Sequence, residues 1–190
     1  MVILSNQLFT LTVQAMKKYF FLLIFFSCNI VFSQSLDELK ALALKDAKTT
    51  AKATLEMDFE TVLKYTHPDI IKNSGGKDVL MQNIKATFDE LNEQGFVFEK
   101  AEVLEVSNLI KEDGEYHCLV KNNNQMKLPG TRIKSISYLF GFYDDLKKQW
   151  YFLEARQLKN KALVDQFLPG FKTSINLPDD ETTTESIKNK

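Results

Sequence analysis

Residues 131–143, TRIKSISYLFGFY, decide the fold of this chain, because they predict one long strand. The segment is rich in β-branched and aromatic residues, which favour strands. Three other segments share this composition, and short turns such as Pro129-Gly130 separate the segments from one another. The four predicted strands are 96–110, 115–127, 131–143 and 149–158. Long strands joined by short turns pair antiparallel, so we predict a curved antiparallel sheet of about four long strands.

The residues before this sheet predict three helices. The first is a stretch without proline or glycine whose apolar residues gather on one side, with Asp46 intruding on that side. The second must end before Pro68, and the third ends beside Gly95, which suits a left-handed helix cap. The predicted helices are 36–57, 59–65 and 77–94. We therefore expect a single α+β domain, residues 34–177, with the helices on one face of the sheet.

The C-terminal residues predict one more short helix and then a disordered end. Apolar residues over 161–167 form the helix, which ends before Pro169. From residue 178 onward the sequence is PDDETTTESIKNK, in which Ile187 is the one large apolar residue. Such a composition cannot build a packed core, so we expect residues 178–190 to be a disordered acidic tail.

Residues 16–33, MKKYFFLLIFFSCNIVFS, predict a secretory signal peptide. Two lysines form its positive end, an apolar run follows, and Val31 and Ser33 suit the positions before a cleavage site. The run is shorter than the ~20 apolar residues that a membrane-spanning helix needs. We expect an exported protein, periplasmic or secreted, in which residues 1–15 are a non-native upstream extension.

The two cysteines bear on how the protein could be anchored and on whether it can form a disulfide. Cys28 lies within the apolar run and leaves a second interpretation open, in which it carries a lipid that anchors the protein to a membrane. Cleavage before Gln34 leaves Cys118 alone in the mature chain, so no intramolecular disulfide can form. Stability must then come from an apolar core, which a chain of this length can bury.

Charge and ligand counts exclude two classes of function. The chain has 24 basic and 25 acidic residues, and cleavage removes two lysines, so the mature charge is 22 − 25 = −3. The basic residues are dispersed, whereas nucleic-acid binding needs a concentrated basic surface. His67, His117 and one mature cysteine lack the spacing of a zinc site. We expect no nucleic-acid partner, no metal and no cofactor.

Three helices followed by a meander of long strands resembles the nuclear transport factor 2-like superfamily, which includes SnoaL-like and ketosteroid isomerase-like proteins. The resemblance covers about Leu36 to Leu158 and rests on FETVLKYTHP (59–68), Gly75-Gly76-Lys77 and WYFLE (150–154). It implies a cone-shaped, cystatin-like fold with a cavity between sheet and helices. Members range from isomerases to binding modules, so the fold does not imply an activity.

Six residues are candidates for lining that cavity, and three of them can exchange protons. Among these three, His67 titrates near neutral pH, and burial of Glu154 would raise its pKa. A local role in a turn is the alternative for His67, and an exposed pair with Arg156 is the alternative for Glu154. The six candidate ligand-binding residues are Tyr65, His67, Tyr116, Trp150, Phe152 and Glu154.

The expected function is non-catalytic binding of a small apolar ligand, or of a protein partner, by an exported bacterial protein. One alternative is a cofactor-independent isomerase or hydratase that uses Tyr65, His67 or Glu154 as acid and base. A second alternative is a structural homodimer, formed through the open face of the sheet. Membrane attachment is expected only if Cys28 carries a lipid.

Overall fold

The computed structural model describes residues 35–187. The predicted upstream extension (1–15), the signal peptide (16–33) and Cys28 lie outside the described residues, and their assignments stay predictions. The helices and strands described below belong to one compact unit, Leu36–Lys190.

Helices precede a sheet, and a further helix interrupts the sheet near its end. The helices before the sheet are α2 (Leu36–Leu55), α3 (Phe59–Lys64), α4 (Pro68–Asn73) and α5 (Lys77–Glu93). The strands are β1 (Val97–Val106), β2 (Ile110–Glu112), β3 (Glu115–Leu128), β4 (Thr131–Asp144), β5 (Gln149–Glu154) and β6 (Glu181–Ser186). A 3-10 helix, η1 (Ala155–Lys159), and α6 (Lys161–Phe167) lie between β5 and β6.

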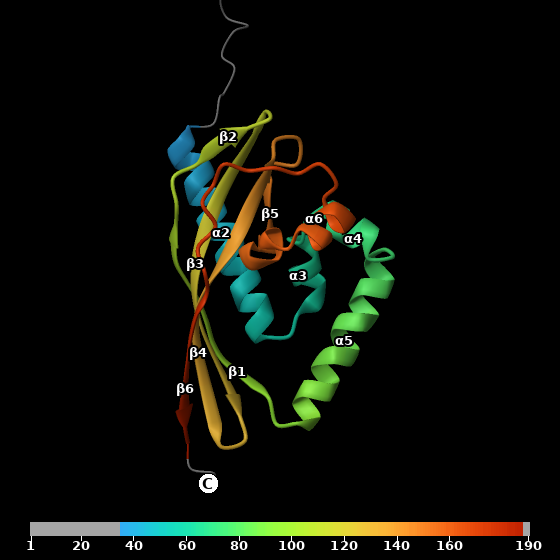
Figure 1. Ribbon diagram of the computed structural model, residues 1–190, viewed down its shortest axis with the longest axis vertical. Coiled ribbons are helices and arrows are strands. Elements are labelled where there is room, and N and C mark those ends of the chain that lie inside the picture. The colour runs from blue at the N-terminus through green and yellow to red at the C-terminus, as the bar shows by residue number, and fades with distance from the viewer. Residues whose placement is uncertain (1–34, 188–190) are drawn as a thin grey trace, which may run out of the picture. The chain divides into compact units, whose positions relative to one another are not determined.

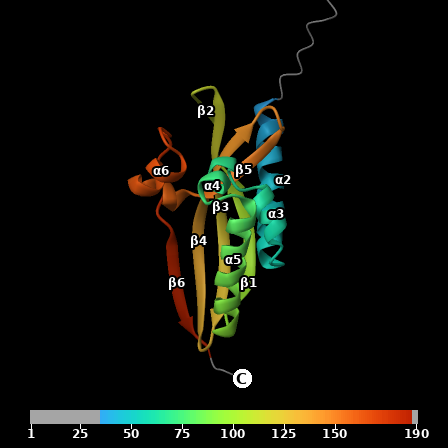
Figure 2. The ribbon, with the colours of Figure 1, turned by 90° about the vertical axis from the view of Figure 1, so that its right-hand side faces the viewer.

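Within residues 35–187 the strands form one six-stranded antiparallel sheet. The order across it is β1-β3-β4-β5, with β2 beside β3 and β6 beside β4. β5 and β6 share one side of β4, because β5 pairs with residues 139–144 and β6 with residues 131–136. Figures 1 and 2 show the N-terminal helices packed on this sheet. The predicted α+β class is therefore confirmed.

α4 is the helix that the sequence analysis missed. Pro68 was interpreted as the end of a helix, and in the structure it also begins the next one. A proline fits the first helical turn because the N–H that it lacks would have no partner there. His67 caps α4, since its Nδ1 atom accepts a hydrogen bond from the backbone N–H of Asp69 at 3.2 Å.

The expectation of a disordered tail over 178–190 is wrong for residues 181–186. These residues form β6, which pairs with β4 from Thr131↔Ser186 to Ile136↔Glu181. Figure 1 shows the strand, in red, along the lower part of β4. Two factors favour it: three consecutive threonines suit a strand, and Arg132 and Lys134 of β4 bind Glu185. Residues 188–190 lie outside the described residues.

The sheet is not strongly curled, so the predicted cone is not confirmed (Figure 1). β1 carries two irregularities in its pairing with β3, at Phe98/Lys100 and at Val103/Glu105. The single strand predicted over 96–110 is divided at residues 107–109, between β1 and β2. The strand predicted over 149–158 ends at Glu154, where η1 begins.

Both faces of the sheet are covered, although helices were predicted on only one. We call the first the α2 face, because Cys118, Val120 and Trp150 pack there against Leu39 and Ala43 of α2. The opposite face, the α6 face, carries a second cluster that packs against α4, η1 and the residues after α6. Its main members are Leu119, Phe140, Phe142, Tyr151, Leu153, Leu158, Ile70, Leu168 and Phe171.

A glycine makes close packing possible at the centre of the α2 face. A Cβ atom at Gly141 would lie 2.8 Å from Cys118 Sγ and 3.1 Å from Trp150 Cε3. The first distance is shorter than real Cβ contacts and the second is tight, so these two side chains fill the space above the glycine. Cys118 is fully buried, and burial raises the pKa of its thiol to about 12. A core role for Cys118 follows.

Candidate functional site

Most of the predicted site residues lie in the hydrophobic core. Tyr65, Trp150 and Phe152 are 9%, 0% and 5% exposed and belong to the cluster on the α2 face. Tyr116 packs against the same cluster and is half-buried. The indole Nε1 of Trp150 donates a hydrogen bond to the backbone carbonyl of Leu39 at 3.0 Å. These contacts explain the residues as packing that joins α2 to the sheet.

His67 lies against the other face. Its ring meets the ring of Phe142 edge-on, with 4.6 Å between centroids, and Phe142 belongs to the cluster on the α6 face. Burial lowers the pKa of His67, and the carboxylate of Asp69 partly opposes that shift. Together with its capping of α4, this position agrees with the local role that was the alternative for His67.

Glu154 ends β5 on the α2 face, two residues beyond Phe152, and is half-buried. Burial raises its pKa, Arg156 lowers it, and the carboxylate of Asp180 raises it further. Arg156 pairs with Asp180, with 3.9 Å between Nε and Oδ2. The three side chains gather where β5 ends and β6 is about to begin. Tyr65 and His67 lie against opposite faces, so the predicted acid and base groups do not converge.

A strip of polar side chains crosses the α2 face, and the sequence analysis did not single it out. Asn122 of β3 and Ser137 of β4 are direct partners, and both are buried. Asn124 Nδ2 donates to Ser137 Oγ at 3.0 Å. Asn122 Oδ1 is buried and has no hydrogen-bond partner within the described part of the chain. The alternation from Cys118 and Val120 could have placed Asn122 on this face.

α5 lies over the part of the sheet that carries this polar strip, but none of its side chains is fully buried there. Phe88 of α5 contacts Phe98 of β1, with 5.8 Å between ring centroids, and Phe98 shares the α2 face by its pairing with Met126. The apolar stripe along α5 is half-buried, and none of the helix's 17 residues is fully buried. The stripe consists of Leu80, Ile84, Phe88 and Leu91. Figure 2 shows α5 in front of β1, β3 and β4.

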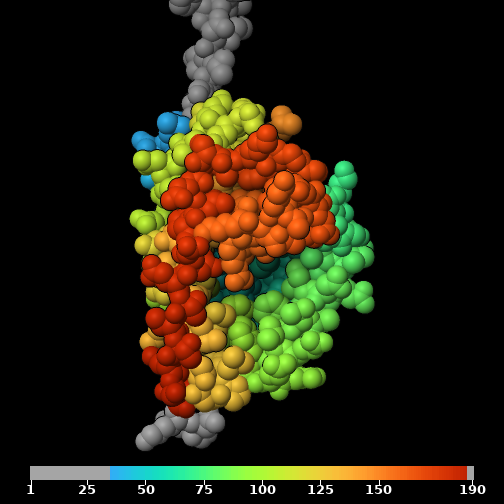
Figure 3. Space-filling view, in the orientation of Figure 1, coloured from blue at the N-terminus to red at the C-terminus, as the bar shows by residue number. Residues whose placement is uncertain are grey.

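A hollow lies beside α5. Figure 3 shows the surface recessed between η1, α5 and the lower part of β4, which are orange, green and gold. The other side of α5 is open surface, where Asp78, Lys85 and Asp89 border a shallow depression. These three charged residues therefore lie outward, while the apolar stripe lies on the side of α5 where Phe88 contacts Phe59 and Phe98.

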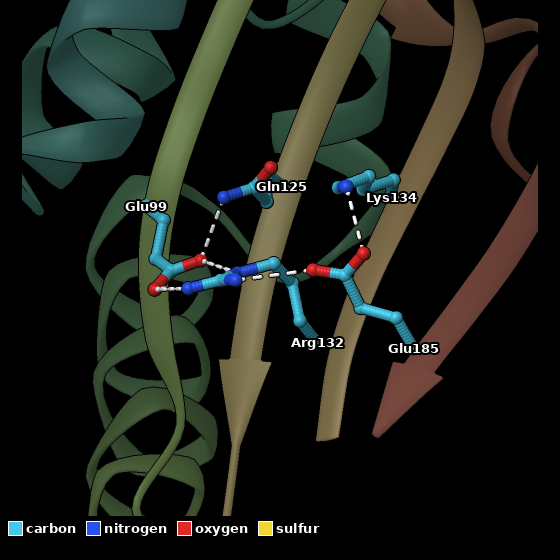
Figure 4. Close-up of polar contacts among 5 residues, drawn as sticks. All are labelled: Glu99, Gln125, Arg132, Lys134 and Glu185. Atoms are coloured by element: carbon cyan, nitrogen blue, oxygen red, sulfur yellow. Dashed lines mark hydrogen bonds and ion pairs between the residues drawn. The ribbon is translucent and has the colours of Figure 1, made fainter. Parts of the chain in front are cut away.

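A charged network lies on the α6 face, behind the hollow. Arg132 donates from Nε and Nη2 to the two oxygens of Glu99, at 2.6 and 3.0 Å, and from Nη1 to Glu185 at 3.0 Å. Lys134 and Gln125 complete it through Glu185 and Glu99 (Figure 4). These hydrogen bonds lower the pKa of Glu99 to about 2. The network joins β1, β3, β4 and β6, so it has a clear structural role.

Neither a metal centre nor a membrane-spanning helix is found within residues 35–187. In that range, no three histidine, cysteine or acidic side chains gather closely enough to hold a metal ion. No helix in the same range combines the length and the apolar character that crossing a membrane requires. Compared with known proteins, the chain matches no protein-family model and no curated protein.

Proposed function

We propose that this chain is a binding protein that holds a small, largely apolar ligand in the hollow between α5 and the α2 face. The proposal rests on two observations together, the half-buried apolar stripe of α5 and the recess that Figure 3 shows beside this helix. A helix stripe of this kind ordinarily packs against a core, and concave apolar surfaces are the usual ligand sites. Covering ~100 Å² of that stripe would contribute about 2.5 kcal/mol to binding.

Several positions support binding rather than catalysis. Tyr65 and His67 lie against opposite faces, and Glu154 ends β5 beside Arg156 and Asp180 rather than beside either of them. The buried Cys118 has a thiol pKa of about 12, so it is not a nucleophile at neutral pH. An isomerase or hydratase would need an acid and a base that reach the same bound ligand.

The homodimer has less support. The part of the α6 face nearest the β3–β4 turn is covered by charged side chains, including Lys121, Arg132 and Lys134. Burying such a surface against a second copy would desolvate several ion pairs. A protein partner on the sheet is disfavoured for the same reason, so the small ligand is the better proposal.

The proposal also includes that the protein is exported and that it belongs to the nuclear transport factor 2-like superfamily. The signal peptide over 16–33 would place binding in the periplasm or outside the cell. Membership of the nuclear transport factor 2-like superfamily is supported by the order of helices followed by antiparallel strands, and in that superfamily a cavity lies between helices and sheet. A sheet that is not strongly curled fits a more open hollow than a full cone.

The test uses the neutral fluorophore N-phenyl-1-naphthylamine with the chain from residue 34. We expect its fluorescence to rise on binding, and Ile84→Glu to abolish the rise because a charge would enter the hollow. Ala86→Glu is the matched control, since Ala86 lies on the outer side of the same helix. Circular dichroism would confirm that both variants fold. Equal binding by both variants, or no binding by the wild-type chain, would contradict the proposal.

A further inference from the structure

α5 is held to the domain less firmly than the other long helix. None of its 17 residues is buried, and the residues of its apolar stripe are half-buried. α2, by contrast, buries five of its 20 residues, and the indole of Trp150 donates a hydrogen bond to the carbonyl of Leu39 in that helix. Most of the stability of a helix in a protein comes from packing of its apolar face. α5 can therefore detach at a lower cost than α2.

The contacts that hold α5 centre on one side chain, Phe88. Its ring lies 4.8 Å from the ring of Phe59 in α3 and 5.8 Å from the ring of Phe98 in β1, measured between centroids. At the N-terminal end of the helix, Lys77 pairs with Glu60 of α3, and both side chains are more than half exposed. An exposed ion pair of this kind contributes little to stability. The Phe88 ring is thus the main side-chain link from α5 to α3 and to β1.

Glycines lie at both ends of α5. Gly75 and Gly76 precede the helix with φ angles of 94° and 95°, and Gly95 follows it with a φ angle of 79°. Other residues rarely adopt such angles, and glycine also reaches the widest range of alternative ones. Gly76 is the N-cap residue, and it supplies no side-chain hydrogen bond to the first turn. The chain can therefore change direction at either end of α5, and hinges are short segments of this kind.

We infer that α5 is a hinged lid, which swings away from the sheet about Gly75-Gly76 and Gly95 while the rest of the domain stays folded, and so admits the ligand to the hollow. The admission of a ligand rests on the proposed function, whereas the opening of the helix does not. Phe88 holds the lid closed, because its ring contacts both α3 and β1. A detached helix of 17 residues is only marginally stable in water, so opening exposes its amides to exchange.

The test follows amide hydrogen exchange in the chain from residue 34, without ligand. We expect the amides of α5 to be at least about tenfold less protected than those of β3, because α5 opens locally while β3 exchanges through global unfolding. Phe171→Ala removes a ring from the α6 face, which stays packed when the lid opens, so it should speed exchange in β3 but not in α5. Phe59→Ala should speed exchange in α5 about tenfold. Equal acceleration of α5 and β3 by Phe171→Ala would overturn the inference.

A second measurement tests what the lid controls. N-phenyl-1-naphthylamine at about ten times its dissociation constant should slow exchange in α5 about tenfold, because the occupied hollow needs α5 to be closed. If the fluorophore binds but exchange in α5 is unchanged, the lid is wrong and the hollow remains a binding site. If α5 opens alone but no fluorophore binds, the proposed function fails and the hinged helix remains. Phe98→Ala removes the contact with Phe88 from the β1 side, should Phe59→Ala not fold.

Discussion

The carboxylate of Asp46 accepts a hydrogen bond from the backbone N–H of Trp150, with 3.0 Å between Oδ2 and N. Asp46 lies in the middle of α2 and Trp150 in β5, so the bond joins the first helix to the side of a strand that β4 does not occupy. Asp46 is buried, and its burial raises its pKa although the bond to Trp150 lowers it. Asp46, which interrupts the apolar side of α2, therefore holds this helix against β5 through a hydrogen bond.

Asp46→Ala is expected to lower the free energy of unfolding by about 1–3 kcal/mol, because it leaves the buried N–H of Trp150 without an acceptor. Asp46→Asn keeps an acceptor oxygen and should cost less. Urea unfolding followed by tryptophan fluorescence measures both. Equal losses in the two variants would contradict this prediction, because they would show that the charge of the carboxylate, rather than the presence of an acceptor, matters at this position.

The pH dependence of stability at Asp46 has a definite sign. The pKa of Asp46 is raised in the folded state, so its contribution is largest below the unfolded pKa of about 3.9 and is lost as pH rises through the folded pKa. The stability of the wild-type chain relative to Asp46→Asn should therefore be higher in acid than at neutral pH. Urea unfolding of both proteins at about pH 4 and about pH 7 measures it. A constant difference would contradict this prediction.

Gly141→Ala should destabilise the protein by about 1–3 kcal/mol through overpacking, because the new methyl group would overlap Cys118 Sγ and Trp150. Cys118→Ala should relieve part of that cost, so the two changes together should lose less than their sum. Thermal unfolding of the single and double variants gives the coupling. Ser135→Ala, a half-buried position of the same strand, is the control and should change stability little.

His117 should make the fold sensitive to acid. Its ring is buried among Phe140, Phe142 and Phe171, and burial lowers its pKa although Glu115 and Glu112 oppose the shift. A lowered histidine pKa means that the unfolded chain binds protons first, so stability falls as pH drops below about 6.5.

His117→Phe should therefore reduce the stability lost between about pH 7.5 and about pH 5. Urea unfolding at the two pH values measures that loss. Burial also lowers the pKa of His67, so a smaller acid effect should persist in this variant. If His117→Phe loses as much stability in acid as the wild-type chain, groups other than His117 cause the acid sensitivity.

Arg132→Gln should loosen β6, because Arg132 connects Glu185 of that strand to Glu99 of β1. Amide hydrogen exchange over residues 181–186 should become faster, while exchange in β3 changes little. Lys100→Gln is the control, since Lys100 pairs with Glu102 within β1. Slower or unchanged exchange in Arg132→Gln would show that backbone pairing alone holds β6.

Local signals predicted most of the fold, and distant contacts explain what they missed. β3 and β4 end within one residue of their predicted bounds, because Pro129-Gly130 marks the turn between them. α6 was predicted at its observed residues, 161–167. β6 could not be predicted from its own composition, because it depends on pairing with β4 and on Arg132, about fifty residues earlier in the chain.

The candidate site was harder to predict, for a related reason. Trp150 and Phe152 were chosen from an expected cavity, but α2 fills the space in front of them. Asn122 lies in a run of three asparagines, which disfavours a strand and gives no local sign that its side chain is buried. Alternation from Cys118 and Val120 indicates its face, but its burial depends on the pairing of β3 with β1 and β4.

The pairing of β6 with β4 has a consequence for the solubility of the chain. β6 occupies the edge of β4 that β5 leaves uncovered, along residues 131–136, which include Ile133 and Ile136. A chain cut at residue 178 would expose that side of β4 as a bare row of backbone donors and acceptors, a template on which other chains can add strands. Proteolysis after α6 would thus convert a self-contained sheet into one that aggregates through its edge.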